Sequence, residues 1–166
     1  GPRRGAFGMS VTEIEGFSAA VVPPAALLGL DFGEKTIGVA VSDSFQSVAT
    51  PLETVRRRKF TVDAQALLAI VRNRDIRGIV LGLPVNMDGS EGARCQKTRA
   101  FARNLEGVIP LPMAFWDERL STVAAERALL EADTSRKRRA EVIDHVAAGF
   151  ILQGALDRLR HIRGVS

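Results

Sequence analysis

The chain has 166 residues, of which 46% are hydrophobic and 25% are charged, and its net charge is +4 at pH 7. This is the length of one domain and the composition of a globular protein, which excludes a disordered chain, a collagen and a disulfide scaffold. The single cysteine, Cys95, excludes an internal disulfide and a cysteine-based zinc site and favours a reducing compartment, so we expect a cytoplasmic protein. No apolar run approaches the roughly 20 residues that cross a bilayer, so no membrane partner is expected.

The first 24 residues are expected to form a flexible tail outside the domain. Gly1 and Pro2 are typical of the remnant left when a protease removes an expression tag, and Met9 fits a native start. The segment has neither the long apolar stretch nor the small-residue cleavage site of a secretory signal. A single domain is therefore predicted over residues 25–162.

Apolar runs and turn residues predict short strands first and alternating helices and strands later. Leu27, Leu28 and Leu30 form a buried run before Asp31, and Gly33 allows a turn, which predicts a hairpin. The predicted strands cover residues 25–31, 37–42, 49–55, 78–83 and 112–116. The predicted helices cover residues 63–71, 91–105, 122–131 and 141–159. This order predicts an α/β fold with a mixed five-stranded sheet, whose first three strands are antiparallel and whose later strands are parallel, flanked by helices.

Three carboxylates fall where a functional site is expected. Asp31 ends one buried strand and Glu118 follows another, and open sheets bind ligands at the carboxyl ends of their strands. Asp144 lies in a strongly apolar helix, on the same face as Ala147 and Ile151. Each acid also has an ordinary structural interpretation. Asp31 would belong to a hairpin turn, and Glu118 would stabilise the start of a helix. Asp144 would form a salt bridge or lie at the edge of the apolar face of its helix.

Grouped carboxylates repel one another, so these three together would need a divalent cation. Oxygen-only ligation favours Mg²⁺ or Mn²⁺, and one or two such ions can activate water and stabilise the leaving oxygen of a phosphodiester. The constellation therefore predicts a metal-dependent phosphodiesterase with Asp31, Glu118 and Asp144 as catalytic residues and metal ligands. His145 points about 100° away from Asp144 on the helix, so we do not expect it to act as the base.

Basic residues and a glycine-containing loop are further candidates for phosphate binding. The basic runs at residues 56–59 and 136–139 are either solvated surface or part of a nucleic-acid interface. The loop at residues 82–92 precedes a predicted helix whose free amides can hold a phosphate, with Asn86 and Ser90 as further donors. The alternative is an ordinary glycine turn in which Ser90 caps the helix.

Four segments resemble motifs of the YqgF/RuvX family. They are residues 28–43 (LGLDFGEKTIGVAVSD), 82–92 (GLPVNMDGSEG), 117–122 (DERLST) and 144–148 (DHVAA). Each motif is weak alone, but the four occur in the family's order and spacing, and the resemblance as a whole extends over about residues 26–159. Family members are bacterial nucleases with an RNase H-like fold, described as Holliday junction resolvases and as nucleases that mature the precursor of 16S ribosomal RNA.

The resemblance implies the same acidic triad, Mg²⁺ or Mn²⁺ as cofactor, and precursor ribosomal RNA or branched DNA as partner. Thr36 stands where the family commonly carries a basic residue, so Lys35 is expected to supply that phosphate contact. The residues expected to contact nucleic acid are Lys35, Asn86, Ser90, Arg94, Arg119, Arg56, Arg57, Arg58, Arg136, Lys137 and Arg138.

Two other functions are compatible with the sequence. A non-catalytic RNA-binding factor for ribosome assembly would use the same fold but would have no use for three converging acids. The spacing of Asp31, Gly33 and Gly38 also resembles the phosphate motif of actin-like ATPases, but those proteins clamp nucleotide between two domains. The chain is expected to be a monomer or a homodimer, because junction cleavage needs two active sites and single-strand cleavage needs one.

Overall fold

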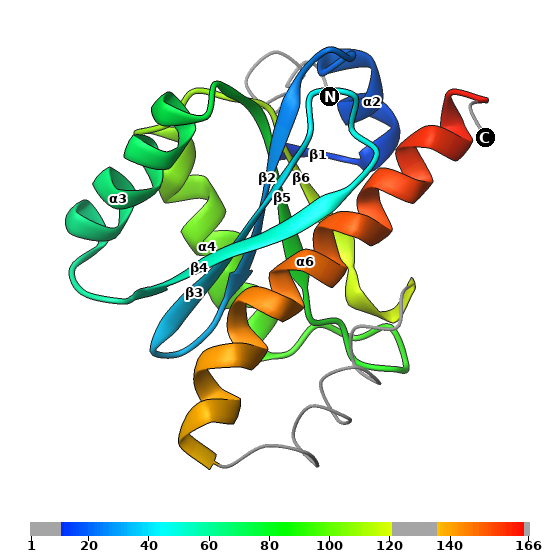
Figure 1. Cartoon of the computed structure of the whole chain (residues 1–166). Helices are drawn as coiled ribbons and strands as arrows, with labels where there is room; N and C mark the ends of the chain where they lie inside the picture. Colours follow the sequence, from blue (N-terminus) through cyan, green and yellow to red (C-terminus); the bar gives the residue numbers. More distant parts are fainter. Residues whose placement is uncertain (1–10, 121–135, 165–166) are drawn as a thin grey trace.

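The computed structural model describes residues 11–120 and 136–164, with side chains for residues 13–120 and 145–164. Its centre is a six-stranded sheet with the strand order β1-β6-β5-β2-β3-β4 (Figure 1). The strands are β1 (Val11–Thr12), β2 (Ala26–Phe32), β3 (Thr36–Ser42), β4 (Ala49–Arg56), β5 (Ile76–Leu83) and β6 (Met113–Asp117). The helical elements are α2 (Ile14–Ala20), α3 (Phe60–Asn73), α4 (Ala93–Glu106), the 3₁₀ turn η1 (Glu118–Leu120) and α6 (Arg136–Ile162).

The strand directions confirm the predicted mixed sheet. β2, β3 and β4 pair antiparallel, whereas β5 pairs parallel with both β2 and β6. The sixth strand, β1, pairs parallel with β6 and is an addition to the five predicted strands. The outer strand β4 carries Pro51, where its register with β3 shifts. The helix predicted at residues 122–131 lies outside the described residues.

Residues 11–24 pack on the domain, so the expectation of a flexible tail up to residue 24 is wrong for this part. Phe17 of α2 is fully buried, and Val21, one helical turn later, is buried in the same core. A Cβ built on Gly78 of β5 would come within 2.8 Å of Cζ of Phe17, so the missing side chain leaves room for the ring. Residues 1–10 lie outside the described part of the chain.

Helices cover both faces of the sheet, with α3 and α4 on one face and α2 and α6 on the other (Figure 1). Side chains alternate between these faces along β2. Leu28 and Leu30 pack with α3 and α4, whereas Leu27 packs with α2 and α6. The same alternation turns Asp31 toward α6 and Phe32 toward α3 and α4.

The helix α6 lies close against the sheet because glycines face it. A Cβ on Gly29 of β2 would come within 2.7 Å of Cβ of Leu152, and a Cβ on Gly82 of β5 would clash with Cδ1 of Ile151. Although α6 is long, neither it nor any other helix within residues 11–120 and 136–164 combines the length and the apolar character of a membrane span.

Candidate active site

Asp31 ends its strand at the edge of the sheet where the parallel strands also end. Its side chain is 4% exposed and belongs to β2. The neighbouring strands β5 and β6 run in the same direction as β2, so their carboxyl ends meet at this edge. Ligands of open sheets bind at such an edge.

A row of paired residues leads from Asp31 across the sheet to α6. Asp31 pairs with Gly38 of β3, and Gly38 pairs with Thr54 of β4. Directly paired residues of antiparallel strands face the same side of a sheet. Thr54 Oγ1 lies 2.9 Å from Nδ1 of His145 on α6. The turn of α6 that contains His145 therefore lies over the row of residues that begins at Asp31.

Glu118 reaches the same side of the sheet from the end of β6. It is the first residue of η1 and directly follows β6. A Cβ on Gly82 would come within 2.8 Å of Oε2 of Glu118, and the same Cβ would meet Ile151 of α6. The carboxylate of Glu118 therefore lies between the end of β5 and α6. Asp31 and Glu118 thus share one edge and one face of the sheet.

Asp144 belongs to α6 and directly precedes His145. Its side chain lies outside the described part of the structure. Among the side chains of residues 13–120 and 145–164, no group of three His, Cys, Asp or Glu residues is placed to hold a metal ion. The two acids that are described, Asp31 and Glu118, present the oxygen donors that a hard divalent cation prefers.

The loop between β5 and α4 is folded by its own polar groups. The backbone N–H of Asn86 donates to the carbonyl of Ser90 over 2.9 Å, and Gly89 has a φ of +91°, which favours glycine. The carboxylate of Asp88 accepts hydrogen bonds from the hydroxyl (2.6 Å) and backbone N–H (2.9 Å) of Ser90, which lower the pKa of Asp88. Ser90 does not cap α4, because Gly92 occupies the N-cap position.

Arg119 is held beside this loop by Asp117. The guanidinium of Arg119 donates to both carboxylate oxygens of Asp117, with the shortest distance at 2.7 Å, and lowers the pKa of Asp117. A Cβ on Gly89 would lie 3.5 Å from Nη1 of Arg119. Arg119 was expected to contact nucleic acid, whereas its pairing with Asp117 was not predicted from the sequence. The acid two residues before an arginine was the available signal for this pairing.

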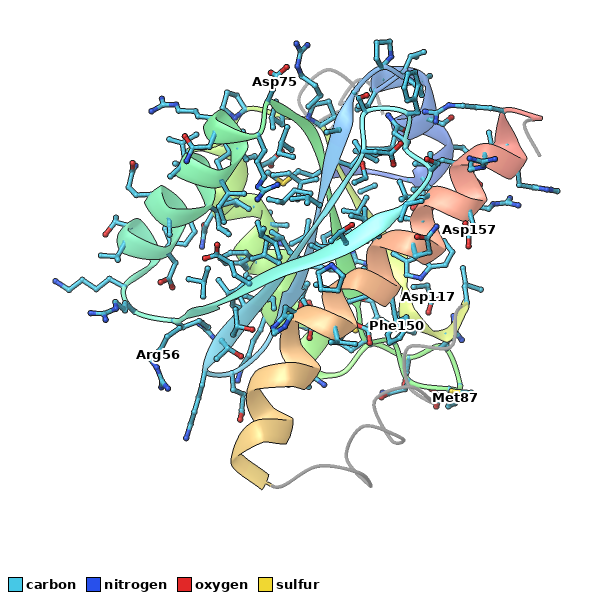
Figure 2. The ribbon with its side chains drawn as sticks, in the orientation of Figure 1. Arg56, Asp75, Met87, Asp117, Phe150 and Asp157 are labelled. Carbon is cyan, nitrogen blue, oxygen red and sulfur yellow. The ribbon has the colours of Figure 1, made fainter. Side chains whose placement is uncertain are left out.

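Arg57 differs from the other residues of the basic run at residues 56–59, because it is half-buried and bonded to the backbone. Nη1 of Arg57 donates to the carbonyls of Gly33 and Glu34, at 2.8 and 2.9 Å, so this side chain holds the turn between β2 and β3. Arg56 points away from the sheet at the end of β4 (Figure 2). The exposed residues among the predicted contacts near this turn are Lys35, Arg56 and Arg58.

The remaining predicted contacts are distributed around the same end of the molecule. Arg94 is exposed on the first turn of α4, on the face of the sheet opposite to Asp31. The run at residues 136–138 starts α6. The side chains of Arg136, Lys137 and Arg138 lie outside the described residues.

The chain matches the model of a family described as "RuvX: Holliday junction resolvase" over residues 25–158. The chain belongs to the RuvX family. A relative from Ruegeria sp. strain TM1040 is 76% identical over 149 residues, which are 90% of this chain and 95% of the relative. A relative from Paracoccus denitrificans strain Pd 1222 is 69% identical over 154 residues, which are 93% and 98% of the two chains. Both relatives are provisionally named pre-16S rRNA nucleases.

A solved structure shares the fold of this RuvX-family chain. It is T. thermophilus RuvC in complex with a Holliday junction substrate, with a TM-score of 0.50 and 11% sequence identity. The match covers 84% of this chain and 96% of that chain. Together with the mixed sheet and its flanking helices, this likeness confirms the predicted RNase H-like fold.

Proposed function

We propose that the protein is a divalent-metal-dependent nuclease that hydrolyses phosphodiester bonds in structured nucleic acid. Asp31, Glu118 and Asp144 would be the ligands of the catalytic cation. The observation that supports this proposal is the row from Asp31 through Thr54 to His145, because the turn of α6 that contains His145 lies at the level of the first acid. Successive residues of a helix rise by about 1.5 Å, so the backbone of Asp144 cannot lie far from that row.

The donor set fits a hard cation. Asp31 is nearly buried and shares one edge and one face of the sheet with Glu118, and a divalent cation would offset the repulsion between carboxylates that face the same site. Carboxylate oxygens favour Mg²⁺ or Mn²⁺ over softer metals. When bound, one or two such ions would activate water and stabilise the leaving oxygen of the phosphodiester.

The neighbouring polar residues would position the strand that is cut. Arg119 is fixed by Asp117, so its guanidinium is held in place beside the loop before any substrate binds. The amide of Asn86 lies in the same loop, and the N–H that it does not donate to Ser90 can donate to a phosphate oxygen. The hydroxyl of Ser90 would have to exchange its hydrogen bond to Asp88 for one to a phosphate. Lys35 lies in the exposed turn after β2 and would contact the phosphate backbone of the nucleic acid from the other side of Asp31.

The names of the relatives and the description of the family suggest two candidate substrates. The relatives named above are provisionally called pre-16S rRNA nucleases, and the matching family is described as Holliday junction resolvases. We therefore propose that the chain matures the 5′ end of precursor 16S rRNA, resolves Holliday junctions, or does both. The exposed basic side chains would contact phosphates without reading sequence, so substrate affinity should fall steeply with salt.

A direct comparison of the two substrates tests the proposal. A labelled precursor 16S rRNA fragment and a labelled four-way DNA junction are incubated with the protein in Mg²⁺, in Mn²⁺ and in EDTA. We expect cleavage of at least one substrate with either ion and none in EDTA. Tight RNA binding without cleavage under any condition would instead indicate a non-catalytic assembly factor.

A further inference from the structure

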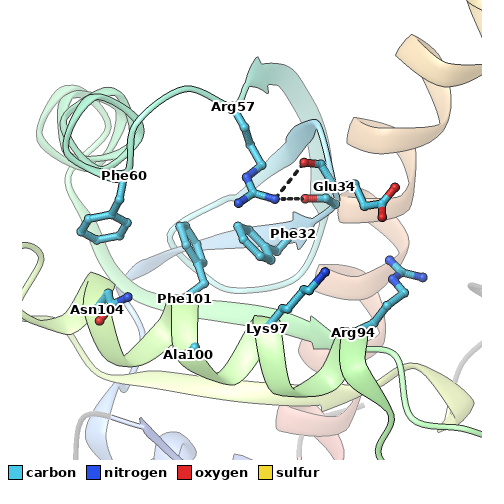
Figure 3. A pocket seen from close by; sticks show the side chains of 10 residues that line it. Phe32, Glu34, Arg57, Phe60, Arg94, Lys97, Ala100, Phe101 and Asn104 are labelled. Carbon is cyan, nitrogen blue, oxygen red and sulfur yellow. Dashed lines mark hydrogen bonds between the residues drawn. The ribbon is translucent and has the colours of Figure 1, made fainter.

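A pocket of about 530 Å³ opens on the face of the sheet opposite to Asp31 (Figure 3). Its walls come from the end of β2 and the turn after it, from Arg57 and the start of α3, and from α4 between Arg94 and Asn104. Three phenylalanines and three basic residues line it: Phe32, Phe60, Phe101, Arg57, Arg94 and Lys97. Neither Asp31 nor Glu118 lines this pocket.

The aromatic wall is a fixed platform. Phe32 and Phe101 stack with their ring centroids 4.2 Å apart, and Phe60 meets Phe101 edge-on at 5.9 Å. The guanidinium of Arg57 lies 4.3 Å from the centroid of Phe32, and two carbonyls hold it there. Phe32 therefore has Phe101 against one face and Arg57 against the other, so a ligand would contact the edges of these rings, which are held in place before it binds.

The open side of the pocket is positively charged. Arg94 and Lys97 lie one turn apart on α4, and both side chains are exposed. Figure 3 shows both of them extending from α4 toward the turn after β2. The carboxylate of Glu34, at the rim, points away from the rings in the same view. The pocket therefore combines aromatic surface with cationic groups, which suits a ligand that has a flat ring and a negative charge.

We propose that this pocket binds one nucleotide unit of the nucleic-acid substrate, with the base against the aromatic wall and the phosphate at Arg94 and Lys97. The inference rests on the proposed nuclease function for the identity of the strand. Asp31 and Phe32 are adjacent but face opposite sides of the sheet, so a bound strand would pass from the carboxylate edge around the turn between β2 and β3. The volume lies in the range of small-ligand pockets, and base stacking on aromatic side chains binds single strands without sequence preference.

Binding measured in EDTA tests the pocket separately from cleavage. A fluorescent single-stranded RNA oligonucleotide is titrated with the wild-type protein and with the variants Arg94→Ala and Lys97→Ala, using anisotropy. Arg103→Ala is the matched control, because Arg103 is exposed on the same helix and does not line the pocket. We expect each pocket variant to weaken binding by about tenfold and the control to stay within about twofold. Equal losses of oligonucleotide affinity in all three variants would show that the effect comes from overall charge, and the assignment of binding to this pocket would then be wrong.

A second variant separates shape from charge. Ala100 lines the pocket, and Ala100→Leu adds bulk there without changing charge. We expect it to weaken oligonucleotide binding as the charge variants do. A free nucleoside monophosphate, titrated in parallel, distinguishes the two sources of a nucleotide. If the monophosphate binds in a pocket-dependent way while oligonucleotide affinity is unchanged by all variants, the assignment to the substrate strand is wrong.

The two proposals fail in different ways. Pocket-dependent binding by a protein that cleaves neither substrate would leave this inference standing and remove the nuclease function. If the protein cleaves normally but its pocket variants bind the oligonucleotide as well as Arg103→Ala does, the nuclease function stands and the pocket assignment is wrong.

Discussion

Thr54 Oγ1 on the outer strand β4 lies 2.9 Å from Nδ1 of His145 on α6. This contact joins residues 91 positions apart and fixes the level at which α6 crosses the sheet. Because Thr54 stands in the same row as Asp31, the contact brings His145 of α6 to the level of this row. Nδ1 of His145 is hydrogen-bonded to Thr54 of β4. This supports a role for His145 in positioning α6 on the sheet.

The Asp31→Asn variant tests the proposed metal ligand. Replacing one carboxylate oxygen by an amide removes the charge that would hold the cation, so we expect cleavage to fall by at least about 100-fold. The fold should be retained, because the two side chains have nearly the same shape. The measurements are cleavage rate and the melting temperature with and without Mn²⁺, which should stabilise the wild type more than the variant.

The matched control is Asp75→Asn, an exposed aspartate paired with Arg77 at the surface. It should cleave and respond to Mn²⁺ like the wild type. Full cleavage by Asp31→Asn would remove this residue from the mechanism.

Gly82→Ala tests the close packing of α6 on the sheet. The added methyl group would clash with Ile151 and lie 2.8 Å from Oε2 of Glu118. Overpacking of this kind costs about 1–3 kcal/mol, and displacement of Glu118 should also lower the cleavage rate. Urea denaturation measures the first effect. Gly107→Ala is the comparison, because its nearest neighbour lies at 3.4 Å, and a similar loss there would argue against the packing explanation.

Arg163→Ala tests how the end of α6 is anchored. Arg163 donates to Oε1 of Gln46, to the carbonyl of Ser18 and to the carbonyl of Val21. Hydrogen bonds to a charged donor contribute about 1.5–3 kcal/mol, so we expect the free energy of unfolding to fall by about 2 kcal/mol. The exposed Arg158, paired with Glu15 at 3.6 Å, is the control. Its replacement by Ala should cost less than about 1 kcal/mol.

The lowered pKa of Asp43 predicts that the folded protein loses stability in acid. Partial burial alone would raise the pKa of its carboxyl, but hydrogen bonds from the backbone of Val48 and from the hydroxyl and backbone of Ser47 outweigh this and lower the pKa to about 2. A lowered pKa means that this stabilisation is fully present above the ordinary value of 3.8 and is lost as the pH falls toward 2.

The measurement compares the wild type with Asp43→Asn by urea denaturation from pH 5 to pH 2. Because the side chain is exposed, solvent screening limits the expected difference to about 1 kcal/mol or less at pH 5. The difference should shrink toward pH 2. A difference that is constant over this range would contradict the assignment of the lowered pKa to these bonds.

Most of the sheet could be predicted because its strands are continuous apolar runs covered on both faces. The run at Leu28 and Leu30 predicts β2, and the one at residues 78–83 predicts most of β5. The segment before residue 25 could not be predicted in the same way. Of its two buried side chains, Phe17 lies in a short helix without a longer periodic pattern and Val21 directly follows that helix, and β1 has two residues.

Some residues of the candidate site could be predicted from local sequence, whereas others depend on contacts between distant parts of the chain. Asp31 and Glu118 could be chosen because an acid at the end of an apolar strand is visible in the sequence. Thr54 could not, because its role depends on the register of three strands and on a helix far along the chain. The pocket was equally hidden, since Phe32, Phe60 and Phe101 come from three separate elements.

The outer strand β4 has a consequence for how copies of the chain can associate. Edge strands with free N–H groups invite pairing with another molecule, and proline, charged side chains and irregular register discourage it. β4 carries Pro51, a register shift beside it, and the charged residues Glu53 and Arg56. Sheet extension across β4 is therefore disfavoured, so a homodimer would have to form through another surface of the molecule, and a mixed-isotope sample should show no intermolecular backbone pairing at this strand.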